Sequence, residues 1–329
     1  MDVLEKLVSL ARSDPGHIVL SEGNDPRVSR AAARAAADGI AHVSVVADAE
    51  TFASHAGDLA GSRKVEIHQP AASPNRLSYA RALFERRKHR GMSLEEAEER
   101  VTDNLTYAAL MVHEGHAGGT IGGAVATTAD TLRAALQIIG KAPDTAIVSS
   151  FFLMALGEPH NRLVVFADCA LVIEPDHEQL ASIALSSARS YRDFVEDEPR
   201  VALLSFSTLG SAEHESVDRV QAAVEIATKQ EPGLQIDGEL QFDAAFVPAI
   251  GQSKAPNSAV AGEANVFVFP SLSAGNIGYK IAQRIGGAAA IGPVIQGLNK
   301  PANDLSRGCS EEDVYQMIAV TSVQAARQF

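Results

Sequence analysis

The sequence predicts an α/β protein built from two lobes. Short β-branched runs alternate with alanine-rich amphipathic stretches along the whole chain, which is typical of α/β folds. A chain of 329 residues is too long for one ordinary hydrophobic core, so two domains are expected. Apolar residues make up 46% of the chain and charged residues 21%, as in a globular protein.

The first series of elements runs to about residue 139. A strand is predicted at 17–21, followed by a polar loop. Asp25 has the pattern of an N-cap and Pro26 that of a first helical position, opening a helix that ends at Asp38. The elements predicted after it are strands at 42–46 and 64–67, helices at 76–89, 94–100 and 104–113, a glycine-rich strand and loop at 118–124, and a helix at 129–139.

A second series begins near residue 146. It comprises predicted strands at 146–152, 163–167, 171–174, 201–206, 266–269 and 288–291, and helices at 180–194, 216–229 and 274–285. Gly292-Pro293 and Lys300-Pro301 interrupt the path to a last helix.

Composition excludes several classes of partner. The net charge of −13 argues against nucleic acid and anionic membranes, because both require a basic surface. No apolar run reaches the roughly eighteen residues of a membrane-spanning helix, and the acidic amphipathic start 1–6 does not resemble a signal peptide. Cys169 and Cys309 form no disulfide framework, so a reducing cytoplasm is expected.

The run 303–313 places two hydroxyls, a guanidinium, a thiol and four carboxylates around a predicted helix start. Ser310 has the pattern of an N-cap and Asp313 that of its acidic partner three residues later. Unpaired N–H groups at a helix start attract anions, and Arg307 adds a planar fork suited to phosphate or carboxylate. The run therefore predicts an oxyanion site beside a possible base. The simpler interpretation is a capping box beside a solvated arginine.

The same run closely resembles the motif near the C-terminus of phosphate acetyltransferases. Four further segments resemble this family in the same order, at 164–168, 236–241, 253–256 and 275–284. The resemblance covers nearly the whole chain. It implies a first lobe of residues 1–145 plus 300–329, completed by the C-terminal helix, and a second lobe of residues 146–299. It also implies an active-site cleft between the lobes, a common place for ligand pockets.

The reaction that the resemblance implies is acetyl-CoA plus phosphate giving acetyl phosphate plus CoA, by direct transfer in a ternary complex. Arg307 matches the arginine that binds the acyl phosphate, and Ser306 the serine that donates a hydrogen bond to the oxyanion. Asp313 matches the aspartate proposed as base for the thiol. Moving a proton from a thiol to an unperturbed carboxylate costs roughly 6 kcal/mol, so this role needs burial of Asp313 or a nearby cation.

Four residues are candidates for binding CoA. Arg87 and Arg133 match arginines that the family uses for the phosphates of CoA. The basic run 86–90 around Arg87 is also typical of a solvated helix end. Thr128 and Lys280 lie in motifs that the family shares, and we expect them to contact a ligand too.

Other chemistry receives less support. Cys309 next to a helix start could form a thioester in a two-step mechanism, although no histidine is near it in sequence. His113 and His116 could suggest a metal site, but no third ligand follows. The glycine-rich run 118–123 matches neither a P-loop nor a dinucleotide fingerprint. We therefore expect no metal and no cofactor, with CoA as a substrate.

Two alternatives to acetyl transfer stay open. A phosphate butyryl- or propionyltransferase would keep the reaction and differ in the size of the acyl pocket. A non-catalytic acetyl-CoA-sensing domain, like the related region of large malic enzymes, would bind without turnover. The family also implies a cytoplasmic homodimer in acetate metabolism, whose partners are CoA, acetyl phosphate and phosphate.

Overall fold

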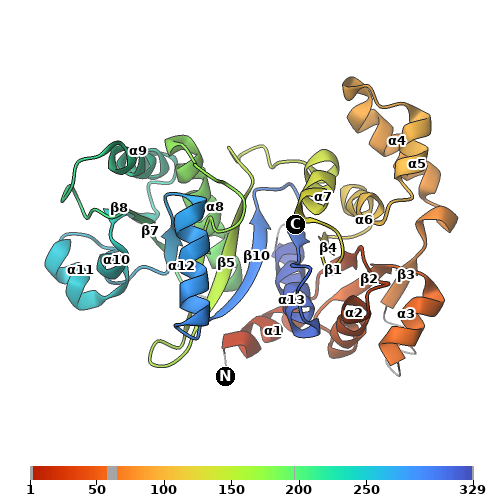
Figure 1. Cartoon of the computed structure of the whole chain (residues 1–329), viewed down its shortest axis with the longest axis horizontal. Coiled ribbons are helices and arrows are strands. Elements are labelled where there is room, and N and C mark those ends of the chain that lie inside the picture. Colours follow the sequence, from red (N-terminus) through yellow and green to blue (C-terminus); the bar gives the residue numbers. More distant parts are fainter. Residues whose placement is uncertain (1–2, 58–64, 196, 328–329) are drawn as a thin grey trace. The chain divides into compact units, whose positions relative to one another are not determined.

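The computed structural model describes residues 3–57, 65–195 and 197–327. The chain divides into two compact units, Met1–Ala142 with Leu298–Phe329, and Pro143–Gly297. The resemblance implies boundaries after residues 145 and 299. Met1 and Asp2 of the predicted amphipathic start, and Lys64 of the predicted strand 64–67, lie outside the described residues. Figure 1 labels most of the elements, and each unit is described by itself.

Unit 1 contains a five-stranded sheet in which every neighbouring pair is parallel. Its strands, in spatial order, are β11 (Ala302–Asp304), β4 (Gly119–Gly122), β1 (His17–Leu20), β2 (His42–Val46) and β3 (Val65–His68). A parallel sheet is normally covered by helices on both faces, and its central strands are then apolar. Ile18, Val19 and Leu20 of β1 are accordingly fully buried.

Helices cover both faces of this sheet (Figure 1). One face carries α1 (Val3–Ser13), α2 (Pro26–Asp38), α3 (Ala49–Ala56) and α13 (Glu311–Arg327). The other carries α4 (Arg76–Arg87), α5 (Leu94–Arg100), α6 (Asn104–His113) and α7 (Thr128–Ala134), the last continued by a π-helical turn at Ala135–Ile139. The C-terminal helix α13 packs close to β4 because Gly119 has no side chain; a Cβ there would lie 2.9 Å from Thr321 Cγ2.

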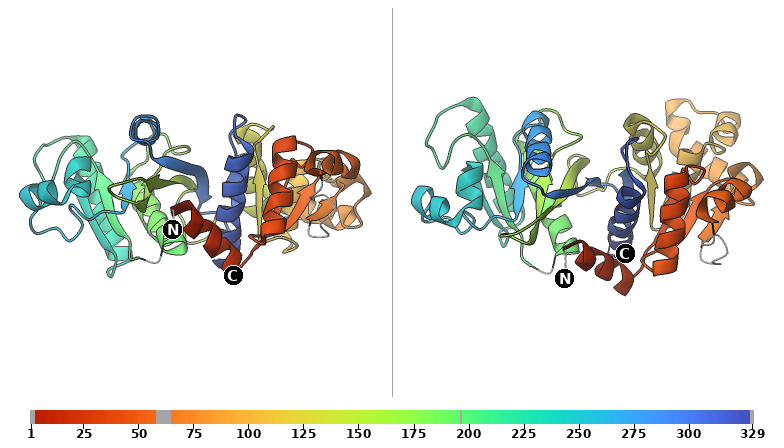
Figure 2. Two further views of the ribbon diagram at one scale, coloured as in Figure 1. Left: turned by 90° about the horizontal axis from the view of Figure 1, so that it is seen from below. Right: turned by 60° about the horizontal axis from the view of Figure 1, so that its bottom comes forward.

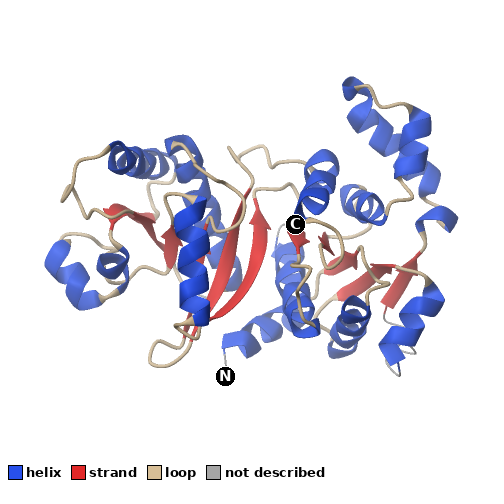
Figure 3. Ribbon diagram, in the orientation of Figure 1, coloured by secondary structure: helices blue, strands red, loops and turns tan. Residues whose placement is uncertain are grey.

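Unit 2 contains a mixed six-stranded sheet. In spatial order its strands are β10 (Ala289–Gln296), β5 (Ser149–Leu156), β6 (Arg162–Ala167), β9 (Val266–Val268), β7 (Arg200–Leu204) and β8 (Gln235–Leu240). The pairs β10–β5 and β5–β6 are antiparallel, and the remaining pairs are parallel. Figure 3 shows these strands framed by helices.

The helices of unit 2 lie on opposite faces of its sheet. Helices α8 (His177–Phe194) and α9 (Glu215–Gln230) cover one face, and α12 (Leu272–Arg284) the other (Figure 2). The short helices α10 (Phe242–Phe246) and α11 (Pro248–Lys254) lie on the α12 side, where aromatic rings form the core. Phe152 stacks on Tyr279 there with ring centroids 4.1 Å apart, which fixes α12 on the sheet.

The structure confirms the predicted helices and most of the strands. The predicted strand 171–174 is wrong, because the N–H groups of Leu171 and Val172 donate to the carboxylate of Asp168 (3.0 and 3.2 Å) and not to a neighbouring strand. Helices α1, α3, α10 and α11 and strands β8 and β11 were not predicted. Within the described residues, no helix is both long and apolar enough to span a membrane.

Candidate active site

Three loops meet at one edge of the unit 1 sheet. Because β1, β4 and β11 are adjacent and parallel, the segments that follow them, 21–25, 123–127 and 305–310, leave the same edge. In open parallel α/β sheets, ligands bind outside the carboxyl ends of the strands. Ser306 and Arg307, two of the predicted catalytic residues, lie in the third of these loops.

Helices α2 and α13 begin from this edge. Asp25 is the N-cap of α2 and accepts from Arg27 N at 2.9 Å. At the start of α13, Ser310 Oγ accepts from Asp313 N (3.1 Å), while Asp313 Oδ2 accepts from Ser310 N (2.8 Å). The predicted capping box is thus confirmed. Two helix N-termini place partial positive charge at the edge that carries Arg307.

Glu22 fixes the loop between β4 and α7. Its carboxylate accepts from three consecutive backbone N–H groups, those of Ala124 (2.7 Å), Val125 (3.2 Å) and Ala126 (2.6 Å). Successive N–H groups that point inwards form a concave anion-binding site. Here the protein's own carboxylate fills that site, so a bound phosphate needs other donors.

Arg27 joins all three loops. Its Nε and Nη2 donate to the Asp25 carboxylate at 3.0 and 2.8 Å. Nη1 donates to the carbonyls of Arg307 (2.9 Å) and Cys309 (2.8 Å), and Nη2 also donates to that of Ala124 (2.9 Å). These bonds use all five N–H donors of the guanidinium. The same contact lowers the pKa of Asp25, chiefly through its hydrogen bond to Arg27.

The backbone around Ser306 and Arg307 is fixed while both residues stay exposed. Gly308 N donates to Ser306 Oγ (3.2 Å), and Cys309 N to the carbonyl of Ser306 (2.9 Å), which closes a tight turn. A hydroxyl and a guanidinium are thus presented side by side in sequence on a rigid turn. Such a pair can donate hydrogen bonds to a developing oxyanion and to a phosphoryl group.

Thr128 is exposed at the start of α7. Its hydroxyl donates to Asp304 Oδ2 at 2.6 Å. Asp304 ends β11 and is only 2% exposed, and burial raises the pKa of its carboxyl group. The hydroxyl proton of Thr128 is therefore already used in the hydrogen bond to the buried Asp304 carboxyl group. A contact between Thr128 and a substrate, which stays a prediction, would have to use the lone pairs of its oxygen.

The remaining predicted binding residues lie on three different helices. Arg133 on α7 forms an ion pair with Asp130, one turn earlier on the same helix. Arg87 is the half-buried last residue of α4, on the same face of the sheet. Lys280 belongs to α12 of unit 2, where its Nζ lies 5.8 Å from the centroid of the Tyr279 ring.

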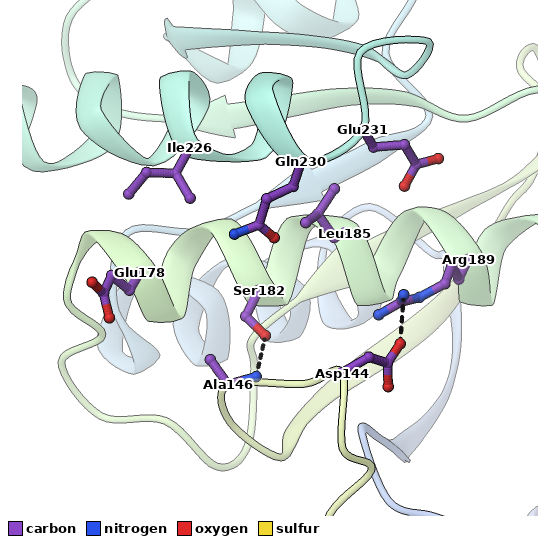
Figure 4. Close-up of a pocket in the computed structure, with 9 residues that line it drawn as sticks. All are labelled: Asp144, Ala146, Glu178, Ser182, Leu185, Arg189, Ile226, Gln230 and Glu231. Atoms are coloured by element: carbon purple, nitrogen blue, oxygen red, sulfur yellow. Dashed lines mark hydrogen bonds and ion pairs between the residues drawn. The ribbon is translucent and has the colours of Figure 1, made fainter.

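A cavity of unit 2 does not contain Lys280. It has a volume of about 490 Å³ and lies between α8 and α9, near the segment that leads into β5 (Figure 4). Arg189 on its wall pairs with Asp144 at 3.0 Å, and Ser182 Oγ accepts from Ala146 N at 3.1 Å. None of the predicted site residues lines this cavity.

Comparison with known proteins decides the family. The model of the phosphate acetyl/butaryl transferase family matches residues 2–322. The chain belongs to this family. A phosphate acetyltransferase of Paracoccus denitrificans is 50% identical over 327 residues, covering 98% of this chain and 99% of that protein. Phosphotransacetylase structures from Streptococcus pyogenes and Staphylococcus aureus are each 44% identical, with TM-scores of 0.91 and 0.90 and 98% of both chains covered.

For a member of this family, the surroundings of Asp313 and Cys309 bear on the mechanism. Asp313 is exposed, so burial does not help it to act as a base. Cys309 is 7% exposed, and burial raises the pKa of its thiol, which weighs against a thioester intermediate. One of the two histidines considered for a metal, His116, forms a hydrogen bond of 2.6 Å between its Nδ1 and the Tyr79 hydroxyl. No three potential ligands within the described ranges gather to hold a metal ion.

Sequence reasoning missed Glu22 and Arg27. Both lie in a polar stretch directly after a predicted strand: Glu22 precedes the N-cap Asp25, and Arg27 lies in the first turn of the helix that follows. A charged loop at that position is the available signal, because such loops form the ligand edge in α/β folds. Their partners, however, are about 100 to 280 residues away, as for Glu22 with Ala124 and Arg27 with Arg307.

Proposed function

We propose that this protein transfers an acetyl group reversibly between CoA and phosphate. Two observations support acetyl transfer within the family. Phosphate acetyltransferases resemble the chain over almost its full length. The second observation, on which the mechanism depends, is the hydrogen-bonded turn that holds Ser306 and Arg307 exposed at the carboxyl edge of the sheet.

In the direction of acetyl-CoA, the CoA thiolate attacks the carbonyl carbon of acetyl phosphate. A C–S bond forms, the bond from carbon to the phosphate oxygen breaks, and phosphate leaves with the electron pair. Arg307 binds the phosphoryl group and stabilises its charge as it leaves. The Ser306 hydroxyl donates to the carbonyl oxygen while it carries negative charge.

Asp313 is the proposed base for the thiol. Both hydrogen bonds from Ser310 are made to its Oδ2, so Oδ1 can receive the thiol proton. Since Asp313 is exposed on unit 1, the roughly 6 kcal/mol cost of full proton transfer must be offset by a cation beside the thiolate. Arg307 is the candidate closest in sequence.

We further propose that Arg87 and Arg133 bind phosphates of CoA and that Thr128 and Lys280 contribute contacts to the substrates. No cofactor besides the substrate CoA enters this mechanism. The two cysteines, both unpaired and buried, are consistent with a reducing cytoplasm. A role in acetate metabolism follows from the proposed reaction.

A homodimer is the proposed assembly. Helix α12 exposes Ile277 (58%) and Ile281 (53%), and the residue that caps its C-terminus, Ile285, is also exposed (84%). The three are spaced by four residues and so lie along one side of the helix. An exposed apolar stripe of this kind is typical of a protein–protein interface. Light scattering of the purified protein tests the assembly, and Ile281→Glu is expected to shift it to monomers.

One assay tests the activity. Purified protein is mixed with CoA and acetyl phosphate, propionyl phosphate or butyryl phosphate, and both the thioester formed and the phosphate released are measured. Fastest turnover with acetyl phosphate supports the proposal. Preference for butyryl or propionyl phosphate would assign the alternative acyl specificity, and CoA binding without turnover would indicate a sensing domain.

A further inference from the structure

Arg27 is built into the molecule as a cross-link between loops. Its side chain is only 26% exposed, although it starts from the first turn of α2. One nitrogen, Nη1, bridges the carbonyls of Arg307 and Cys309, which lie on either side of Gly308. The other, Nη2, reaches the carbonyl of Ala124 on the loop after β4. A single planar group thus fixes the turn at 307–309 and its separation from the neighbouring loop.

Both the carbonyl and the N–H groups of the loop after β4 are bound by side chains of the segment after β1. Arg27 binds the carbonyl of Ala124, and Glu22 binds the N–H groups of residues 124–126. Glu22 and Arg27 both belong to the segment after β1, the central strand between β4 and β2. The segment after β1 therefore aligns the other two loops with each other.

We propose that Arg27 is a positioning residue for acyl transfer: it holds the turn that presents Ser306 and Arg307 in the geometry that the reaction needs. This inference rests on the proposed function. Arg27 donates to backbone carbonyls, to the carboxylate of Asp25 and, at 3.7 Å, to the sulfur of Cys309, so it acts through the turn and leaves substrate binding to Arg307. Displacing a catalytic group by about 1 Å can reduce a rate about 100-fold.

Lysine cannot replace this arginine. An ammonium group is a point donor with three N–H bonds, whereas the guanidinium reaches three carbonyls and a carboxylate in one plane. Arg27→Lys keeps the charge and most of the apolar stem. It should release the turn without removing the helix cap, which depends on Asp25.

The chain offers a matched control on the same helix. Arg30 also connects α2 to the start of α13, through an ion pair with Glu311 at 2.9 Å, but its side chain is 50% exposed. Exposed pairs of this kind contribute little to stability. Arg30→Lys therefore repeats the chemical change, at one turn's distance, without touching the turn at 307–309.

The experiment measures two properties of wild type, Arg27→Lys and Arg30→Lys. Steady-state kinetics with acetyl phosphate and CoA should show kcat lowered about 10- to 100-fold in Arg27→Lys, with KM for CoA within about twofold of wild type. Hydrogen exchange should be faster at residues 305–310 in the same variant. Arg30→Lys should match wild type in both. Asp25→Asn keeps the cap but weakens the hydrogen bonds to Arg27. Its kcat and its exchange rate at 305–310 should lie between those of Arg27→Lys and wild type.

The two readouts separate this inference from the proposed function. If wild type makes no thioester from any acyl phosphate, the proposed function is wrong, and with it the claim that Arg27 serves catalysis. Exchange at 305–310 still reports whether Arg27 holds the turn. If Arg27→Lys keeps wild-type kcat, or loses it with exchange at 305–310 unchanged, Arg27 does not act by positioning the turn. Should Arg27→Lys fail to fold, Asp25→Asn decides by the same two measurements.

Discussion

In the first turn of α13, one carboxylate oxygen of Asp313 accepts hydrogen bonds from both the backbone N–H and the hydroxyl of Ser310, at 2.8 and 2.9 Å. The residue proposed as catalytic base is therefore also the acidic partner of a helix cap. The cap fixes the carboxylate at the edge where Arg307 lies. Proton transfer to Asp313 therefore depends on where the cap holds its carboxylate as well as on its pKa.

Substitution of Asp313 by asparagine separates these two roles. The amide oxygen can still accept from Ser310, so the loss in unfolding free energy should be about 1 kcal/mol or less. An amide cannot take the thiol proton, so turnover should fall about 10²- to 10⁴-fold. Thermal melting and kcat at saturating CoA measure the two effects. Near-wild-type turnover would show that Asp313 is only a cap.

Cys309→Ala should keep most of the activity. Burial raises the pKa of this thiol, and direct transfer does not require it. The alanine variant should lose less than about threefold in kcat, with a loss of about 1 kcal/mol in stability from the cavity. Covalent catalysis would become the better account if kcat collapsed while the melting temperature stayed near that of wild type.

Recognition of CoA can be assigned with Arg87→Ala and Arg133→Ala. If either guanidinium binds the 3′-phosphate, its loss should raise KM for CoA about 10- to 100-fold, the equivalent of about 1.5–3 kcal/mol. The same variant should lose little with dephospho-CoA, which lacks that phosphate. Equal penalties on the two substrates in both variants would exclude recognition of the 3′-phosphate by these residues.

Stability should fall in mildly acidic solution because of a histidine pair. The Ser44 hydroxyl lies 3.0 Å from His17 Nε2 and 3.1 Å from His68 Nε2, and burial, the largest cause, lowers the pKa of both imidazoles. Glu66 opposes this shift at both, while His42 near His17 and His116 near His68 reinforce it.

The sign follows from proton binding. Below the ordinary histidine pKa of about 6.5, the unfolded chain binds protons that the folded imidazoles do not, so stability drops as pH falls. Each histidine adds at most about 1.4 kcal/mol per pH unit. Urea unfolding between about pH 5 and 7.5 should show this slope, and a shallower one in His17→Gln. An identical slope in that variant would remove His17 from the explanation.

The sequence predicted local features of the site well. Ser310 and Asp313 are three residues apart, so their capping box is visible in the pattern, and Asp25 with Pro26 marks the start of α2 in the same way. Arg27 contacts Arg307 across 280 residues, and no local pattern contains that pairing. Its role emerges only when the order of β1, β4 and β11 is known.

Strand errors have similar causes. Strand β8 was missed because Asp237, Gly238 and Glu239 in its middle are disfavoured in strands, and neighbouring strand β7 overrides that preference. The apolar run 171–174 was predicted as a strand, yet the buried carboxylate of Asp168 captures its first N–H groups. In both segments a tertiary contact outweighs local propensity.

The most direct test of the account compares wild type with Arg307→Gln. Arg307 is exposed on a turn held by its backbone, so the substitution should leave the melting temperature unchanged. Wild type should form acetyl-CoA from acetyl phosphate and CoA, and the variant should lose at least about 10²-fold in kcat/KM for acetyl phosphate. Wild-type kcat/KM in the variant would contradict the claim that this edge of the sheet carries out acyl transfer.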